Sequence, residues 1–224
     1  MSSFVLKLIA IITMLIDHIG AVLYPEIRWL RLIGRIAFPI FAYLVAEGFY
    51  KTSDVKKYLK RLFIFALVSQ VPFYLAFKEP THLNIFFTLL ISLYAINKYD
   101  ETKNNIYVVL PGLVAELIGA DYGFYGVLTV FIFYKYHYDF KNMAKNQILL
   151  NLIYSGLNVI GYMIIGGNIG IIRILNLCLQ SFSLISLILI WFYNGERGYS
   201  LKYFFYSFYP VHIFILYLID KFKG

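Results

Sequence analysis

Long apolar runs alternate with short polar segments along the chain of 224 residues, and nine of these runs predict membrane-spanning helices. A helix of about 20 apolar residues crosses a hydrocarbon core of about 30 Å. The second, fourth and fifth runs are short for a full span, so we expect some short or re-entrant helices. The expected helices are Phe4–Leu23, Ile36–Tyr50, Lys57–Phe77, Asn84–Ile96, Ile106–Ala120, Phe124–Tyr138, Ile148–Ile165, Ile169–Phe192 and Tyr203–Ile219.

The composition excludes a soluble domain. The chain is 61% hydrophobic, 20% aromatic and only 14% charged, whereas soluble domains are about 45–50% apolar and about 25% charged. The fold expected is an all-α, polytopic transmembrane helical bundle. No long linker or internal repeat divides it, so residues 1–224 are predicted to form a single integral membrane domain.

Two features of the chain are interpreted as plain membrane-helix sequence. The first apolar run lacks a small-residue cleavage site and contains Asp17 and His18, so we interpret it as a retained helix and not a signal peptide. The single cysteine, Cys178, lies in an apolar run and cannot form an intramolecular disulfide.

Basic residues predict the topology. The densest cluster, at positions 51 to 61, is expected on the cytoplasmic side of the plasma (inner) membrane. Alternation from there places the N-terminus inside, the C-terminus outside, and thirteen of the 20 Lys and Arg residues inside. The net charge of +8 is thereby explained without nucleic acid as a partner. Three of the seven outer basic residues, Arg28, Arg31 and Arg35, lie together, which topology alone does not explain.

Ionisable residues inside membrane segments are costly and indicate functional sites. Glu116 and Arg173 are explained equally well by pairing with an opposite charge. His212 is explained equally well by a hydrogen bond to a backbone carbonyl freed by Pro210. No metal site is expected. The residues in or near the predicted spans are Asp17, His18, Arg35, Glu47, Glu116, Asp121, Arg173 and His212.

Asp17 and His18 are adjacent polar residues late in an otherwise apolar helix. Neighbours on a helix diverge by about 100°, so Asp17 is not expected to orient the His18 ring. We expect Asp17 to pair with a guanidinium of the arginine cluster, and Arg35 to hold the first helix against the second through this pair. His18 is then free to face a cavity, where a neutral imidazole is suited to taking a proton.

Lys7 and His18 are expected on one face of the first helix. Their separation of 11 residues corresponds to roughly 1100°, about 20° beyond three full turns, and to about 16 Å along the axis. A long ligand with an anionic end at Lys7 can therefore place a reactive end at His18. A lysine near a helix start is also a common topology anchor, and the spacing does not separate the two interpretations.

Five blocks spread from end to end carry a resemblance: KLIAIITMLIDHIG, RLIGRIAFPIFAYLVAEGFYKT, KYLKRLFIFALVSQVPF, DYGFYGVL and YNGERGYSLKYFFYSFYPVHIFILYLI. In this order they resemble the TraX family, whose founding member is associated with N-terminal acetylation of conjugative pilin from acetyl-CoA. Lys7, His18 and AFPIFAYLVAEGF are also similar to the start of the type 3 membrane acyltransferases. Those proteins have arginine in place of Lys7, and lysine supplies a point charge where arginine supplies a bidentate fork.

The resemblance implies an integral membrane acetyltransferase with acetyl-CoA as co-substrate. His18, beside Asp17, would act as a general base, or less favourably as a nucleophile that forms an acetyl-imidazole. The candidate residues for binding the coenzyme are Lys7, Arg35, Lys60 and Arg61.

Other residues are candidates for the rest of the site. Donors to the thioester oxyanion are sought in Tyr122, Gln70 or the backbone near Asn194. Glu47, Asp121 and His212 complete the candidate set. The partners expected are the lipid bilayer, acetyl-CoA and an acceptor, whether a peptide amine, a sugar hydroxyl or a glycolipid.

Two other classes of function fit parts of the pattern. A proton-coupled transporter of small solutes would use Asp17, His18 and Glu47 as a proton relay. A non-catalytic assembly factor would tolerate replacement of these polar residues. Binding and slow hydrolysis of acetyl-CoA would distinguish the enzyme from both. The acceptor and the oligomeric state stay open.

Overall fold

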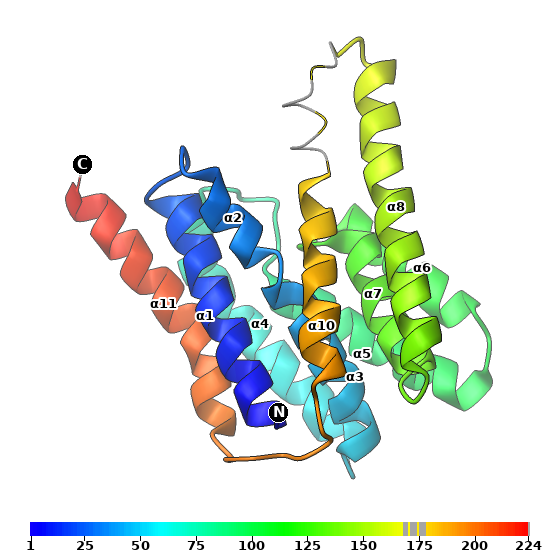
Figure 1. Ribbon diagram of the computed structural model, residues 1–224. Helices are drawn as coiled ribbons and strands as arrows, with labels where there is room; N and C mark the ends of the chain where they lie inside the picture. Colours follow the sequence, from blue (N-terminus) through cyan, green and yellow to red (C-terminus); the bar gives the residue numbers. More distant parts are fainter. Residues whose placement is uncertain (168–169, 171–173, 175–177, 224) are drawn as a thin grey trace.

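The computed structural model describes residues 1–167, 170, 174 and 178–223. Over these residues the chain is an all-α helical bundle (Figure 1). The helices are α1 (Ser3–Val22), α2 (Arg28–Gly34), α3 (Ala37–Lys51), α4 (Val55–Phe77), α5 (Ile85–Thr102), α6 (Ile106–Leu117), α7 (Gly123–Lys135), α8 (Phe140–Ile164), the 3-10 helix η1 (Leu179–Ile185), α10 (Ser186–Trp191) and α11 (Lys202–Lys223). The predicted fold class is confirmed.

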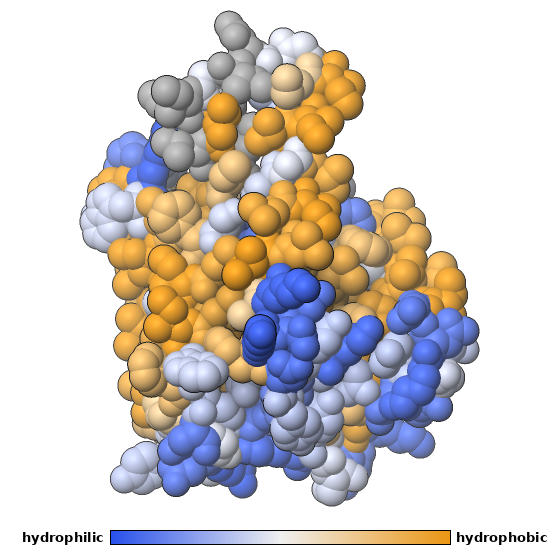
Figure 2. Space-filling view, turned by 45° about the vertical axis from the view of Figure 1, so that its right-hand side comes forward, coloured by the Kyte–Doolittle hydropathy of each residue, from blue (hydrophilic) through white to orange (hydrophobic). Residues whose placement is uncertain are grey.

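The described helices identify a multi-pass membrane protein. Five stretches among them are long and apolar enough to cross a bilayer: α1, α2 continued into α3, α4, α8 and α11. Helices α6 and α7 and the η1–α10 segment are apolar but shorter. Apolar side chains cover much of the surface in Figure 2, and hydrophilic ones gather at the end of the bundle where α1 begins.

Several predicted boundaries differ from the structure. Arg28 and Arg31 lie between two predicted helices but belong to the short helix α2, and Arg35 is its C-cap residue. Helix α5 continues past the predicted apolar run to Thr102, and α8 starts before its predicted run, at Phe140. Both extensions are polar turns. The eighth predicted helix lies partly outside the described residues, as does Arg173, and its described part is η1 followed by α10.

Side-chain caps fix the starts of three helices. Asp54 accepts a hydrogen bond from the backbone N–H of Lys57 at 2.9 Å, where α4 begins. Asn84 caps α5 and Asp139 caps α8 in the same way. Each cap satisfies a backbone donor that the first turn of a helix leaves free. Polar chemistry therefore sets these boundaries.

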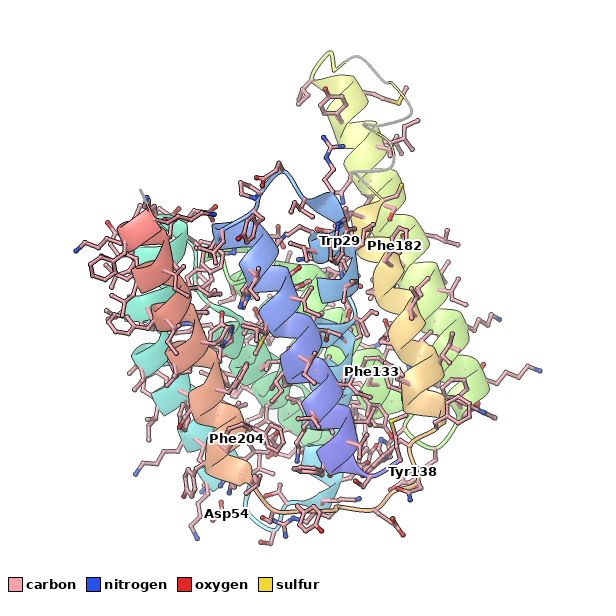
Figure 3. All side chains as sticks on the ribbon, turned by 60° about the vertical axis from the view of Figure 1, so that its left-hand side comes forward. Trp29, Asp54, Phe133, Tyr138, Phe182 and Phe204 are labelled. Carbon is pink, nitrogen blue, oxygen red and sulfur yellow. The ribbon has the colours of Figure 1, made fainter. Side chains whose placement is uncertain are left out.

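Helix α1 lies between α3 and α11 and contributes to the fully buried core through Leu6 and Ala10. The chain ends lie at opposite ends of the bundle, and the loop before α11 crosses the end where α1 begins (Figure 1). Asp54 and Tyr138 lie at this end in Figure 3, and Trp29 lies toward the other. We call these the N-terminal end and the distal end of the bundle.

Candidate functional site

A cavity of about 1020 Å³ runs through the bundle from the N-terminal end to the distal end. Its walls come from helices α1 to α5 and α11, together with the loops at both ends. Apolar side chains, among them Phe38, Leu62 and Phe86, line its middle. The cavity therefore joins two polar regions across an apolar interior.

The opening at the N-terminal end is basic. We call its six cations the basic mouth: Lys7, Lys51, Lys57, Arg61, Arg197 and Lys202. Two of them have carboxylate partners, since Lys51 lies 2.6 Å from Glu47 and Lys57 lies 3.2 Å from Asp54. Within the described part of the chain, the other four have no salt bridge to a carboxylate. Such a convergence of unpaired cations favours an anionic ligand.

Three of the predicted coenzyme-binding residues are on the cavity wall and one is not. Lys7 lies with its Nζ 5.7 Å from the centre of the Phe205 ring, and Arg61 lies over Tyr58. Arg35 lines the distal half of the cavity. Lys60 is exposed and is absent from the cavity wall, because it points away from Arg61, its neighbour on α4.

The arginine cluster meets Asp17, as the sequence predicts. Arg35 Nη2 donates to Asp17 Oδ1 at 2.9 Å, and Arg31 Nη1 donates to Oδ2 at 2.7 Å and to the Asp17 backbone oxygen at 3.1 Å. Helix α2 brings both guanidinium groups to one carboxylate, whose side chain is only 10% exposed. Two donors on one buried carboxylate tie α1 firmly to α2.

His18 faces the cavity and pairs with another histidine. Its Nδ1 lies 2.7 Å from Nε2 of His212 on α11, and the two rings are nearly parallel at 7°. Nδ1 of His212 lies 2.6 Å from the backbone oxygen of Phe208. Phe77 and Tyr209 stand edge-on to the His18 ring. The sequence suggested a backbone carbonyl for His212 but gave no indication that its partner is His18.

The distal end of the cavity holds an imidazole beside a carboxylate. Nε2 of His82 lies 3.7 Å from Oδ1 of Asp121, and Nδ1 lies 4.0 Å from Oε2 of Glu79. The interaction with the Asp121 carboxylate raises the pKa of His82 above its ordinary value. His82 and Asp121 lie in loops, outside the membrane-spanning helices.

The two distal loops are fixed to each other. The backbone N–H of Leu83 donates to Gly119 at 2.8 Å, and Asp121 N–H donates to Leu83 at 2.9 Å. Thr88 Oγ1 donates to the Asp121 backbone oxygen. A Cβ atom on Gly119, which has φ of +67°, would stand 2.6 Å from the backbone oxygen of Thr81, so only glycine fits this approach. The position of Asp121 is therefore built into the fold.

The suggested oxyanion donors are only partly placed at the cavity. Tyr122 lines it, with its ring stacked on Phe38 at 3.9 Å. Gln70 is absent from the wall; its side chain donates to the His82 backbone at 2.8 Å and accepts from Asn84 at 2.7 Å. The Asn194 side chain donates to Glu196 at 2.8 Å and is likewise absent from the wall. Gln70 and Asn194 thus shape the loops.

Glu47 belongs to a separate network near the basic mouth. Its carboxylate lies 2.9 Å from Nε2 of His137 and accepts a hydrogen bond of 2.6 Å from Tyr193, besides its contact with Lys51. Asp17 is occupied by two arginines, so the hydrogen bonds of the described residues do not link the suggested relay of Asp17, His18 and Glu47.

Glu116, for its part, caps α7 by accepting from the Phe124 N–H at 2.9 Å.

Sequence reasoning missed His82, His137 and Arg197. His82 and Arg197 lie outside the predicted apolar runs, and His137 lies at the end of the run Phe124–Tyr138. A signal was available for His82, because it lies two residues before the predicted span that starts at Asn84, and Asp121 directly follows the span that ends at Ala120. Among the described residues, no group of three or more His, Cys, Asp and Glu side chains is arranged to hold a metal ion.

Comparisons with known proteins agree on one family. The family model described as "TraX protein" matches residues 2–220. A probable fimbrial assembly protein FimC of Dichelobacter nodosus is 28% identical, over 96% of this chain and 94% of its own length. A protein TraX of Escherichia coli is 26% identical, over 65% of this chain and 60% of its own. No solved structure matches the chain.

Proposed function

The chain belongs to the TraX family, and from that premise we propose that it is an integral membrane acetyltransferase that moves the acetyl group of acetyl-CoA to an acceptor. One observation carries this proposal. One cavity connects the basic mouth, where four described cations have no carboxylate partner, to the His18 imidazole through an apolar interior. Acetyl-CoA has the matching form, with phosphates at one end, a reactive thioester at the other and a long, thin arm between them.

The basic mouth supplies the coenzyme site in this proposal. Lys7, Arg61, Arg197 and Lys202 hold the phosphates, because no carboxylate of the described chain neutralises them. The pantetheine arm follows α1 toward His18, along the face shared by Lys7 and His18. In this proposal the mouth faces the cytoplasm, where acetyl-CoA is made; the excess of basic residues expected on that side supports this orientation.

The distal end receives the acceptor. The acceptor is a peptide amine or a glycan hydroxyl, whose nucleophilic group meets the thioester beside His18. His18 Nε2 removes the proton of that group as the new N–C or O–C bond forms. The C–S bond then breaks, and the coenzyme leaves as a thiol after taking up a proton. Tyr122, Arg31 and Arg35 line the same region of the cavity and stabilise the negative charge on the thioester oxygen.

Substitutions of two neighbouring cations on α4, Arg61 and Lys60, test the coenzyme site. Arg61 lines the cavity, whereas Lys60 is exposed outside it. The purified protein should bind acetyl-CoA and hydrolyse it slowly. Arg61→Ala should weaken binding about 10-fold or more, as expected when a charge-assisted contact worth about 1.5–3 kcal/mol is lost, whereas Lys60→Ala should bind normally.

The outcomes separate the three classes of function. Absence of acetyl-CoA binding by the folded wild-type protein would overturn the acetyltransferase and favour a transporter or an assembly factor. Equal weakening by Arg61→Ala and Lys60→Ala would indicate general surface charge and remove the cavity from the proposal. Lys7→Ala should weaken binding and Lys7→Arg should restore it, since both basic side chains can contact phosphate.

A further inference from the structure

His18 lines the cavity and forms a hydrogen-bonded pair with His212, which is not itself part of the cavity wall. They are 194 positions apart in the sequence, and α1 and α11 bring their nitrogens to 2.7 Å. His212 is buried at 5% exposure, with the rings of Phe208 and Tyr209 packed against it. Its position against His18 is therefore set by the packing of the two helices.

The positions of the protons in this pair follow from the backbone oxygen of Phe208, which can only accept a hydrogen bond. The backbone oxygen of Phe208 has no proton, so the short contact at 2.6 Å requires a proton on Nδ1 of His212. In the neutral ring Nε2 of His212 then has a lone pair. It accepts from Nδ1 of His18, which carries that proton.

We infer that His212 is a positioning residue: it holds His18 in the Nδ1–H tautomer and leaves the Nε2 lone pair of His18 facing the cavity. Nε2 has no hydrogen-bond partner among the described residues and is the one ring nitrogen of the pair left for a ligand. The benefit to acetyl transfer rests on the proposed function. The fixed tautomer is a property of the pair itself.

The neutral partner also defines how a proton moves. When Nε2 of His18 takes a proton from the acceptor, the positive charge is shared across the 2.7 Å contact with His212. The nearest carboxylate in the sequence, Asp17, is held by Arg31 and Arg35 and does not contact the ring. His212 thus takes the place that a carboxylate has in a Ser-His-Asp triad, without its negative charge.

Nitrogen NMR of histidine-labelled protein tests the tautomer directly. The full chain contains four histidines, so single substitutions assign each ring. Wild-type His18 should show a protonated Nδ1 and an unprotonated Nε2. In His212→Phe the ring is kept but the acceptor is lost, so His18 should shift toward the Nε2–H form. His82→Gln is the matched control, because it removes a cavity-lining imidazole that does not touch the pair, and it should leave the His18 signals unchanged.

Activity gives the second measurement. Acetyl-CoA turnover should fall about 10–100-fold in His212→Phe, by analogy with residues that orient a metal-bound imidazole. A wild-type spectrum with His18 in the Nε2–H form would overturn the inference, whether or not His212→Phe folds. An unchanged Nδ1–H tautomer in folded His212→Phe would overturn it as well. The predicted tautomer shift in a protein that never turns over acetyl-CoA would support the pair and reject the acetyltransferase.

Discussion

Gly34 of α2 lies directly against Asp17 of α1: a Cβ atom built on Gly34 would stand 2.0 Å from Oδ1 of the carboxylate. The missing side chain is what allows the short helix to approach α1. That approach in turn lets two guanidinium groups reach one carboxylate. The geometry of the arginine cluster therefore depends on a residue that carries no charge.

Gly34→Ala should destabilise the protein by about 1–3 kcal/mol, because the added methyl group displaces the Asp17 carboxylate from Arg31 and Arg35. Thermal unfolding in detergent measures the change. Gly156→Ala on α8 is the matched control, since nothing lies within 4 Å of its added Cβ. The control should be neutral or more stable by about 0.4–1 kcal/mol. Equal melting temperatures for the two variants would show that Gly34 has no such role.

His18→Ala should lower acetyl transfer by about 10²–10⁴-fold and leave the amount of folded protein unchanged. The substitution leaves no unpaired charge, because the neighbouring Asp17 is paired with arginines. Turnover of acetyl-CoA by monodisperse protein is the measurement. Turnover near that of the wild type would remove His18 from the mechanism.

Asp17→Asn should instead reduce folding. It leaves two guanidinium groups without their carboxylate, and loss of one member of a buried ion pair costs about 3–5 kcal/mol. The yield and melting temperature of folded protein should both fall below those of His18→Ala. Retention of wild-type stability would mean that the Asp17 cluster does not hold α1 to α2.

The His82–Asp121 pair predicts a pH dependence of stability. The pKa of His82 is raised in the folded protein, so the pair stabilises the fold fully below the unfolded pKa of about 6.5 and loses this effect as pH rises through the folded pKa. The melting-temperature difference between wild type and Asp121→Asn should therefore be larger near pH 5.5 than near pH 9. Partial exposure keeps the effect at about 1 kcal/mol or less. A difference that grows with pH would contradict the pairing.

Opposite ends of the bundle should label from opposite sides of the membrane. Lys57→Cys should be protected from an impermeant thiol reagent in intact cells, and Glu26→Cys and Lys223→Cys should react, in a Cys178→Ser background. The reason is the excess of basic residues at the N-terminal end. Labelling of position 57 from outside would reverse the orientation and with it the side from which the coenzyme arrives.

The apolar runs predicted the helices because a backbone in hydrocarbon must satisfy its own hydrogen bonds. They missed the polar ends of α5 and α8 for the same reason: those turns need no apolar side chains. The Lys98–Glu101 ion pair, at 2.7 Å, and the Asp139 cap stabilise helix there instead.

The site was predictable where one helix carries it, or where successive helices do, as for Asp17 and its two arginines. Lys7 and His18 share α1, so their spacing alone placed both on the cavity wall. The partner of His18 comes from α11, and hydrophobic periodicity contains no information on which helices become neighbours. The same limit hid the contact between His82 and Asp121, which depends on two loops being hydrogen-bonded to each other.

His18 and His212 are 194 positions apart, so the ribosome makes His18 well before the residue with which it pairs. At about 5–20 residues per second, roughly 10–40 s pass between translation of the first histidine and translation of the second. During that interval the nascent chain already displays the anion-attracting lysine and the lone imidazole of its first helix. Without α11, however, the wall of the cavity is open and that imidazole has no fixed tautomer. A ribosome-bound chain that still lacks α11 therefore has no partner for Nδ1 of His18.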